Sequence, residues 1–332
     1  MGGSVYVIAE MACSHDGDPG LARTIIDGAG RAGADAIQFQ VWSRADLLVP
    51  HHRDYDKLGK IELSRSDWAG LAKYVRDTYP RMHIVACVYE RGSVEFCESI
   101  GIDAYKLHSG DLDNPQLVKC VAATGRRIDL SVGASTVEEI QAAIGWIRAL
   151  SASPIWLMYG YQDFPTRIDD VHLSYMQKLR ALFELPLGYQ DHSAAESEAG
   201  FWLPAAAIGM GVDILEKHIT HDRARKGVDH EAALNPDEFA RFVEMVRSME
   251  RARGVSTPKP FSPEQLRYRK HARKSIVTSR SLPAGTVLCE SDLAALRTEE
   301  PGLPPVEVGR LVGKKVIRAL PQYHPIRESD VQ

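Results

Sequence analysis

Polar residues recur at the ends of short apolar segments in this chain. The segment DAIQFQ (35–40) carries Gln38 and Gln40, whose side chains leave the same face of a strand because they are two residues apart. A buried amide costs free energy unless it is hydrogen-bonded, so two of them at the end of a strand indicate contact with a ligand. Other segments end in the same way, with Glu10, Lys106, His108, Ser109, Asp111, Ser131, Gln162, Gln190, Asp191, His192, Glu216, Lys217 and His218.

His192 and His218 are candidate metal ligands. They follow the last two of the strands expected in this part of the chain, and two imidazoles on neighbouring strands could hold a divalent cation with positions left open for substrate and water. Two hydrogen-bonded structural histidines are the alternative that these residues leave open. His230 is a possible third ligand, although a histidine in a loop is usually only solvated.

Lys106, Ser109 and Ser131 together predict a site for a phosphate or a carboxylate, because one cation and two hydroxyls supply donors for an oxyanion. Lys106 could also pair with Glu10 or Asp111, and both interpretations can hold at once. Asp111 is the candidate general base because it lies on a loop beside these donors. Its alternative role is to cap the helix that begins near Asn114.

Apolar and amphipathic segments alternate along the chain and must position these residues. Strand-like segments occur at 5–10, 35–40, 83–88, 103–108, 127–133, 155–160, 185–190 and 212–218, each followed by a helical pattern. Such alternation predicts an α/β fold with a parallel sheet, and eight units within about 250 residues predict a (β/α)₈ (TIM) barrel whose site lies at the carboxyl ends of the strands. A doubly wound open sheet is the alternative, but no GxGxxG follows the first strand. For the helix after the fifth strand, Ser135 with Glu138 predicts a capping box.

The composition changes after Gly254. We expect the barrel in residues 1–255, a polar, proline-bearing linker in 256–272 and a small, mostly β domain in 273–332. Lysine and arginine number 40 against 44 aspartate and glutamate, so we expect neither nucleic acid nor a membrane surface as a partner. The five scattered cysteines, without a CxxC pair, indicate reduced thiols in a cytoplasm, and neither a signal peptide nor a membrane span is expected.

Several motifs together resemble the sialic acid synthase family. They are VIAEMACSHDGD, AGADAIQFQ, DAYKLHSGDLDNPQLV, GYQDHS, ILEKHIT and KGVDHEAALNPDEF, and ARKSIV with LPAGTVL is similar to that family's C-terminal antifreeze-like (SAF) domain. The resemblance implies a TIM barrel followed by this small domain, and a domain-swapped homodimer in which the small domain covers the partner's barrel. It also implies condensation of phosphoenolpyruvate with an aldose such as an N-acetylhexosamine, giving a 2-keto-3-deoxy sugar acid (a nonulosonate) and phosphate.

The resemblance also implies roles for individual residues. His192 and His218 match metal ligands, with Mn²⁺ the expected ion and Mg²⁺ or Co²⁺ the other possibilities. Lys106, Ser109 and Ser131 match contacts to phosphoenolpyruvate. Asp111 matches the carboxylate that activates the water, and Glu10 and Asp229 match residues that contact the sugar.

The chain departs from the family's common pattern on the substrate side. Glutamine replaces lysine at Gln38, asparagine at Gln162 and serine at Gln190, and phenylalanine replaces tyrosine at Phe164. The small-domain arginine usually precedes Pro-Gly; in LRTEEPG, either Arg297 is displaced by one residue or its role is lost to Thr298. Arg44 is a candidate replacement for the missing cation, and Gln38 could alternatively only hydrogen-bond Gln162 or Gln190. The departures leave open a metal-dependent aldolase or lyase that uses pyruvate or another unphosphorylated donor, and a non-catalytic carbohydrate-binding relative.

Overall fold

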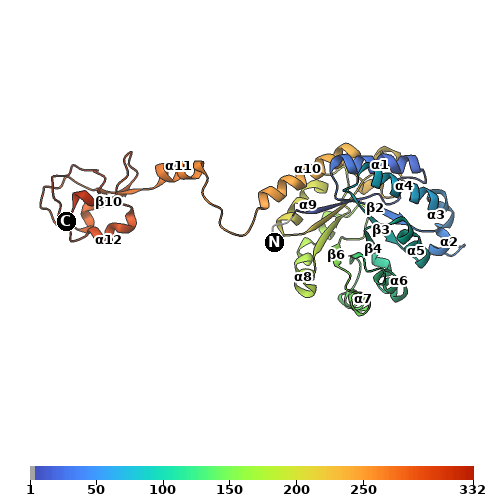
Figure 1. Cartoon of the computed structure of the whole chain (residues 1–332). Coiled ribbons are helices and arrows are strands. Elements are labelled where there is room, and N and C mark those ends of the chain that lie inside the picture. The colour runs from blue at the N-terminus through green and yellow to red at the C-terminus, as the bar shows by residue number, and fades with distance from the viewer. Residues whose placement is uncertain (1–3) are drawn as a thin grey trace. The chain divides into compact units, whose positions relative to one another are not determined.

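The computed structural model describes residues 4–332 and divides the chain into two compact units (Figure 1). The first unit ends at Val255, and the second spans Ser256–Gln332. No helix in the described part of the chain is long and apolar enough to cross a membrane.

The strands of the first unit form a closed barrel. They are all parallel, and each pairs with its neighbours in chain order. They are β1 (Tyr6–Glu10), β2 (Ala36–Val41), β3 (His83–Val88), β4 (Ala104–Leu107), β5 (Arg127–Ser131), β6 (Ile155–Tyr159), β7 (Leu187–Asp191) and β8 (Ile214–His218). The predicted TIM barrel is therefore confirmed, and the open-sheet alternative is wrong because β1 and β8 pair along Tyr6–Glu10.

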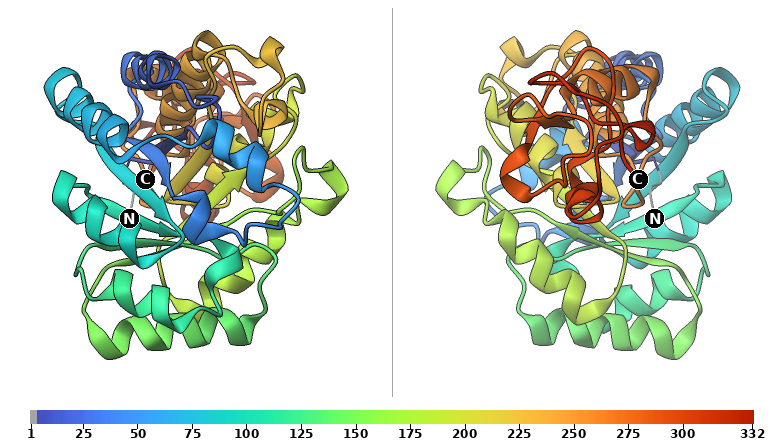
Figure 2. Two further views of the ribbon diagram at one scale, coloured as in Figure 1. Left: turned by 90° about the vertical axis from the view of Figure 1, so that its right-hand side faces the viewer. Right: turned by 90° about the vertical axis from the view of Figure 1, so that its left-hand side faces the viewer.

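Helices lie outside the strands of this unit (Figure 2). They are α1 (Pro19–Ala32), α2 (Arg44–Leu47), α3 (Tyr55–Ile61), α4 (Arg65–Thr78), α5 (Arg91–Ile100), α6 (Pro115–Ala122), α7 (Val137–Leu150), α8 (Leu173–Phe183), α9 (Ala199–Gly209) and α10 (Pro236–Arg253). Their apolar faces cover the outward residues of the strands, such as Ile37 and Phe39 of β2, and this is the main core.

Alternate residues of the strands point into the barrel. There, Ile8, Ala36, Val85, Ala104, Met158 and Ile214 form a separate buried apolar cluster. At Gly188 a Cβ atom would lie 2.4 Å from the Met158 sulfur, so Met158 fills the space that the glycine leaves. This inner cluster closes the barrel below its carboxyl end, which we call the mouth. A ligand can therefore enter only as far as the polar residues above the cluster.

The cap of α7 differs by one residue from the sequence prediction. Thr136, not Ser135, is the N-cap: its side chain accepts the Glu139 N–H at 3.2 Å, and the Glu139 carboxylate accepts the Thr136 N–H at 2.7 Å. The sequence STVEE offers two overlapping capping boxes. The second box is the one that forms, after a turn in which Ala134 has a left-handed backbone (φ +56°).

We expect Thr136→Ala to lower the free energy of unfolding by about 1 kcal/mol, because the Glu139 N–H at the start of α7 loses its side-chain acceptor. Ser135→Ala is the matched control, since the Ser135 hydroxyl makes only a 3.3 Å contact with the Gly133 carbonyl. Urea denaturation of both variants measures the difference. Equal losses in the two variants would contradict the assigned cap.

The second unit has a small core of its own. It contains α11 (Pro263–Ala272), the antiparallel pair β9 (Ser275–Thr278) and β10 (Leu293–Leu296), and α12 (Val308–Leu311). Its core residues are Ile276, Leu282, Leu288, Leu311, Val316, Leu320, Ile326 and Val331. Asp330 is fully buried and accepts hydrogen bonds from Arg318 at 2.7 Å and 3.0 Å. Helix α11 lies inside the stretch predicted as a linker, so that stretch is not without regular structure.

Candidate active site at the mouth of the barrel

Charged and amide side chains line the interior at the mouth. Each lies two residues after a member of the inner apolar cluster, so strand alternation directs it inward, one layer nearer the mouth. These side chains are Glu10 on β1, Gln38 on β2, Lys106 on β4 and Glu216 on β8, all at most 5% exposed. The structure therefore brings these four predicted strand-end residues together in one layer of the barrel interior.

Lys106 is held between two carboxylates. Its Nζ lies 2.6 Å from Glu216 Oε1 and 3.6 Å from Glu10 Oε2. Burial alone would lower the pKa of Lys106, but the charges of Glu216 and Glu10 outweigh burial and raise it. Lys106 is therefore a permanent cation at neutral pH. Sequence reasoning anticipated the pair with Glu10, but it gave no role to Glu216, the nearer partner.

A hydrogen-bonded chain links three strands across the mouth. The Ser131 hydroxyl donates to Gln190 Oε1 at 2.9 Å, and Gln190 Nε2 donates to Glu216 Oε1 at 3.0 Å. These contacts fix the orientation of the Gln190 amide and connect Ser131 to the carboxylate that holds Lys106. The three residues therefore form one network with the lysine.

Gln38 makes no such contact. Both its amide atoms are buried without a hydrogen-bond partner in residues 4–332, so the expectation that it only bonds Gln162 or Gln190 is wrong. Oε2 of Glu10 and of Glu216 also lack hydrogen-bond partners there. Gln40, in contrast, donates to Glu10 Oε1 at 3.4 Å and accepts from the Tyr89 hydroxyl at 3.3 Å. Buried polar atoms are rarely left unpaired, so their concentration in one layer indicates a place for polar ligand atoms.

The two candidate metal ligands are neighbours. The ring centroids of His192 and His218 are 5.4 Å apart, and the Phe164 ring lies 4.3 Å from the first and 5.7 Å from the second. Burial lowers the pKa of both imidazoles, so both are neutral, as metal binding requires. Nδ1 of His192 lies 2.8 Å from the Tyr161 carbonyl, so it carries the proton and leaves Nε2 as a ligand atom.

This donor set fits a metal ion with two protein ligands. Nδ1 of His218 is buried and has no hydrogen-bond partner among residues 4–332, as expected of an atom that contacts a bound ion or ligand. In the chain from residue 4 onward, no group of three or more His, Cys, Asp or Glu side chains is arranged to hold a metal. His230 is therefore not a third ligand; its Nε2 lies 3.4 Å from the Thr220 hydroxyl, and its ring lies 5.9 Å from that of His221.

Asp111 and Ser109 lie on one 3-10 turn (Ser109–Asp111) directly after β4. Asp111 accepts a hydrogen bond from the Asn114 side chain at 3.2 Å, and burial raises its pKa. The cap of α6 is Asn114 itself, which accepts the Leu117 N–H at 3.2 Å. Asp111 is therefore not the helix cap, and its carboxylate remains available for chemistry.

Most of the remaining predicted residues lie on loops, and Arg44 begins helix α2. Asp229 has a left-handed backbone (φ +63°), burial raises its pKa, and its charge acts on Glu10. Gln162 makes a local 3.5 Å contact with the Gly160 carbonyl. Arg44 stacks its guanidinium 4.7 Å above the Tyr55 ring and does not hydrogen-bond Gln38. Arg297 is exposed, directly after β10 in the second unit.

Two residues of the predicted set face away from the mouth. Lys217 Nζ lies 2.5 Å from Asp191 Oδ2, and Asp191 also accepts from Tyr189 at 3.0 Å and from the Ser193 hydroxyl at 2.9 Å. Both charges are at most 1% exposed. Because successive residues of a strand alternate in direction, Asp191 and Lys217 point to the outer core while their neighbours Gln190, Glu216 and His218 point inward. Including them among the strand-end site residues was wrong.

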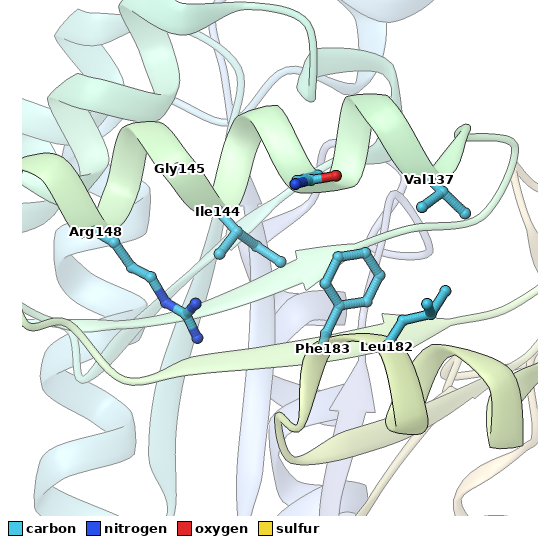
Figure 3. Close-up of a pocket in the computed structure, with 7 residues that line it drawn as sticks. Val137, Ile144, Gly145, Arg148, Leu182 and Phe183 are labelled. Carbon is cyan, nitrogen blue, oxygen red and sulfur yellow. The ribbon is translucent and has the colours of Figure 1, made fainter.

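A groove on the outside of the barrel is separate from this site. It lies between α7 and α8 and is lined by Val137, Gln141, Ile144, Gly145, Arg148, Leu182 and Phe183 (Figure 3). None of these residues belongs to the polar set at the mouth. The groove is mostly apolar and offers one cation, so we do not assign the chemistry to it.

A closed (β/α)₈ barrel with ionisable residues at its carboxyl end is the architecture of the barrel enzymes. The chain belongs to the NeuB family, whose model matches residues 25–257, and the SAF domain model matches residues 273–332. The resemblance to the sialic acid synthase family is thereby confirmed, including its small C-terminal domain.

Individual relatives agree with this assignment. The chain is 30% identical to the N-acetylneuraminate-9-phosphate synthase of Homo sapiens, over 97% of this chain and 91% of that protein. It is 29% identical to the N,N'-diacetyllegionaminic acid synthase of Legionella pneumophila, over 94% and 90%. Among solved structures, the N-acetylneuraminic acid synthetase of Leptospira borgpetersenii, in complex with citrate, is similar with a TM-score of 0.73 and 28% identity, over 81% of this chain and 92% of that one.

We expect Lys217→Met to lower the free energy of unfolding by about 3–5 kcal/mol, because Asp191 would remain buried and charged without its partner. The double variant Lys217→Met/Asp191→Asn should recover much of this loss, since no unpaired charge remains. Chemical denaturation of the two variants and the wild type provides the comparison. A loss below about 1 kcal/mol in the single variant would show that the pair is not a buried ion pair.

Proposed function

We propose that the protein condenses phosphoenolpyruvate with an aldose, of the N-acetylhexosamine type or a related sugar aldehyde, to a 2-keto-3-deoxy sugar acid of the nonulosonate class, with release of phosphate. The observation that carries the proposal is the buried Lys106 cation, paired with Glu216 and Glu10 and surrounded by unpartnered polar atoms. The names of the relatives, which are sialic and legionaminic acid synthases, support it.

His192 and His218 would hold the divalent cation, with Mn²⁺ expected and Mg²⁺ or Co²⁺ as other possibilities; when bound, it would polarise the acceptor aldehyde. Lys106, with Ser109 and Ser131, would bind the anionic groups of phosphoenolpyruvate and hold its C3 against the aldehyde carbon. This arrangement favours formation of the new C–C bond, which leaves positive charge at C2.

Water then adds at C2, and the bond between C2 and the phosphate oxygen breaks. Asp111 would take the proton of this water, and its raised pKa brings it closer to the range of an effective base. Burial also raises the pKa of Glu10, which suits it to donate a hydrogen bond or proton to a sugar oxygen, with Asp229 beside it. Phe164 would exclude water from the histidine pair.

The second candidate is an aldolase or lyase that uses pyruvate or another unphosphorylated donor. The neutral Gln38 favours it, because a phosphate gains less from an amide than from an ammonium group. The ion pairs of Lys106 argue against the lysine-dependent form of such chemistry, since a Schiff base requires a free amine. A metal-dependent pyruvate enzyme and a non-catalytic carbohydrate-binding relative remain as outcomes of the test.

We further propose a domain-swapped homodimer, in which the second unit of one chain covers the mouth of its partner. The charges of the units are complementary: residues 1–255 contain 27 lysine and arginine against 36 aspartate and glutamate, and residues 256–332 contain 13 against 8. The partner's Arg297 or another cation of that unit, or Arg44, would then supply the positive charge that Gln38 lacks. The five free cysteines agree with action in the cytoplasm.

We expect phosphate release when the protein is given phosphoenolpyruvate, Mn²⁺ and the right aldehyde. The screen covers N-acetylhexosamines, their 6-deoxy di-N-acetyl relatives and pentoses, with pyruvate in place of phosphoenolpyruvate as the matched control. Condensation with pyruvate and none with phosphoenolpyruvate would favour the aldolase. Sugar binding without turnover with either donor would favour the carbohydrate-binding protein.

Removal of the metal should abolish turnover, and Mn²⁺ should restore it better than Mg²⁺ or Co²⁺. His192→Ala and His218→Ala should each lose bound metal by equilibrium dialysis while circular dichroism shows a folded barrel, because each removes one of two protein ligands. His51→Ala, at an exposed loop position, is the control and should keep its metal. Unchanged metal content in both test variants would contradict the assigned ligands.

A further inference from the structure

A second row of polar side chains lies above Gln38 and Lys106 at the mouth. It consists of Gln40, next to the last residue of β2, and of Tyr89 and His108, which directly follow β3 and β4. In the strand register, Gln40 pairs with Cys87, and Cys87 pairs with Lys106. Tyr89 and His108 lie two residues after Cys87 and Lys106, so the row runs across three adjacent strands. The Tyr89 hydroxyl donates to Gln40 at 3.3 Å, and the Tyr89 ring lies 5.8 Å from the His108 ring. The row is continuous, and His108 is its end.

His108 shares the inward face of Lys106. It lies two residues further along a backbone that is still extended (φ −67°, ψ 147°), and Leu107 between them is buried in the outer core. The charges of Lys106 and Glu216, which lie on β4 and β8, both act on it. The imidazole therefore lies in the mouth.

The hydrogen bonding of His108 fixes its tautomer. Nδ1 accepts the Gly110 N–H at 3.2 Å, so the ring proton is on Nε2. Burial lowers the pKa of His108 to about 4, which leaves the ring neutral at physiological pH. Within residues 4–332, Nε2 has no hydrogen-bond partner. His108 thus presents one free, neutral donor at the mouth.

We propose that His108 is a substrate-contacting residue whose Nε2–H donates a hydrogen bond to the anionic end of the donor substrate, a phosphate or carboxylate oxygen. This assignment rests on the proposed function. Lys106 and Ser109, the expected contacts of that substrate, lie on either side of His108 in the chain. A donor here replaces part of the stabilisation that Gln38 cannot give. Because the ring is neutral, it adds a hydrogen bond without a second positive charge beside Lys106.

Three variants separate this role from a role in the turn. His108→Asn can still accept the Gly110 N–H, because its amide oxygen lies near the position of Nδ1, but it has no donor at Nε2. His108→Gln places an amide nitrogen near the position of Nε2 and so keeps the donor. His108→Ala removes both contacts. All three are compared in the full-length, metal-loaded protein.

We expect the KM for phosphoenolpyruvate to rise about ten- to a hundredfold in His108→Ala and His108→Asn, the range for loss of a hydrogen bond to a charged group. His108→Gln should change it much less, and the KM for the sugar should not change. A wild-type KM for phosphoenolpyruvate in His108→Asn, or a rise in the sugar KM instead, would overturn the assignment.

The proposed function can fail independently. It fails if the wild type releases no phosphate with any aldehyde of the screen. The same variants are then titrated with phosphoenolpyruvate and with pyruvate by calorimetry. Weaker binding of either anion by His108→Asn than by His108→Gln supports the role of His108, and equal affinities, or no binding by the wild type, overturn it.

Discussion

The ion pair between Lys106 and Glu216 inside a closed barrel is the interaction on which the site depends. A charge removed from water must be paired and hydrogen-bonded, and the apolar cluster below it leaves these groups no access to solvent from that side. The pair fixes Lys106 as a cation and, through Glu216, orients Gln190 and Ser131. One lysine therefore organises three neighbouring polar groups and still faces the space where a ligand would lie.

Strand alternation separates groups that serve the site from groups that serve the core. Asp191 and Lys217 are as strongly charged as Glu216, yet they form their own buried pair behind β7 and β8. That pair joins the two strands at the residues next to His192 and His218. The ion pair thus lies on the outer side of the two strands, at the positions adjacent to the two histidines.

Among the described residues, the side of the mouth around Gln38 has little free positive charge. Gln38 and Gln40 are amides, His108 is neutral, and the Lys106 cation is already paired with carboxylates. Arg44 is engaged with the Tyr55 ring in the space that Gly59 leaves. The proposed donor, phosphoenolpyruvate, would then be bound by hydrogen bonds from neutral groups, by the proposed metal ion, or by cations from the second unit of the proposed dimer partner. Each source gives weaker or more conditional binding than a fixed lysine.

The sequence by itself determined the fold class and the end of the barrel where the site lies. Eight repeats of apolar strand and amphipathic helix can close only in a few ways, and polar residues at the strand ends mark one edge. The motifs of the sialic acid synthase family were long enough to identify the family and to single out Lys106, His192 and His218.

Only the tertiary structure decided which polar residues face one another. Glu216 and Lys217 are adjacent in the chain, but a shift of one residue in a strand reverses the direction of a side chain. The N-cap of α7 also differs by one residue from the sequence prediction, because it is Thr136 and not Ser135. The partner of Lys106 and the free donor of His108 depend on contacts between strands far apart in sequence. Local propensity carries no information about such contacts, because they arise only when the barrel closes.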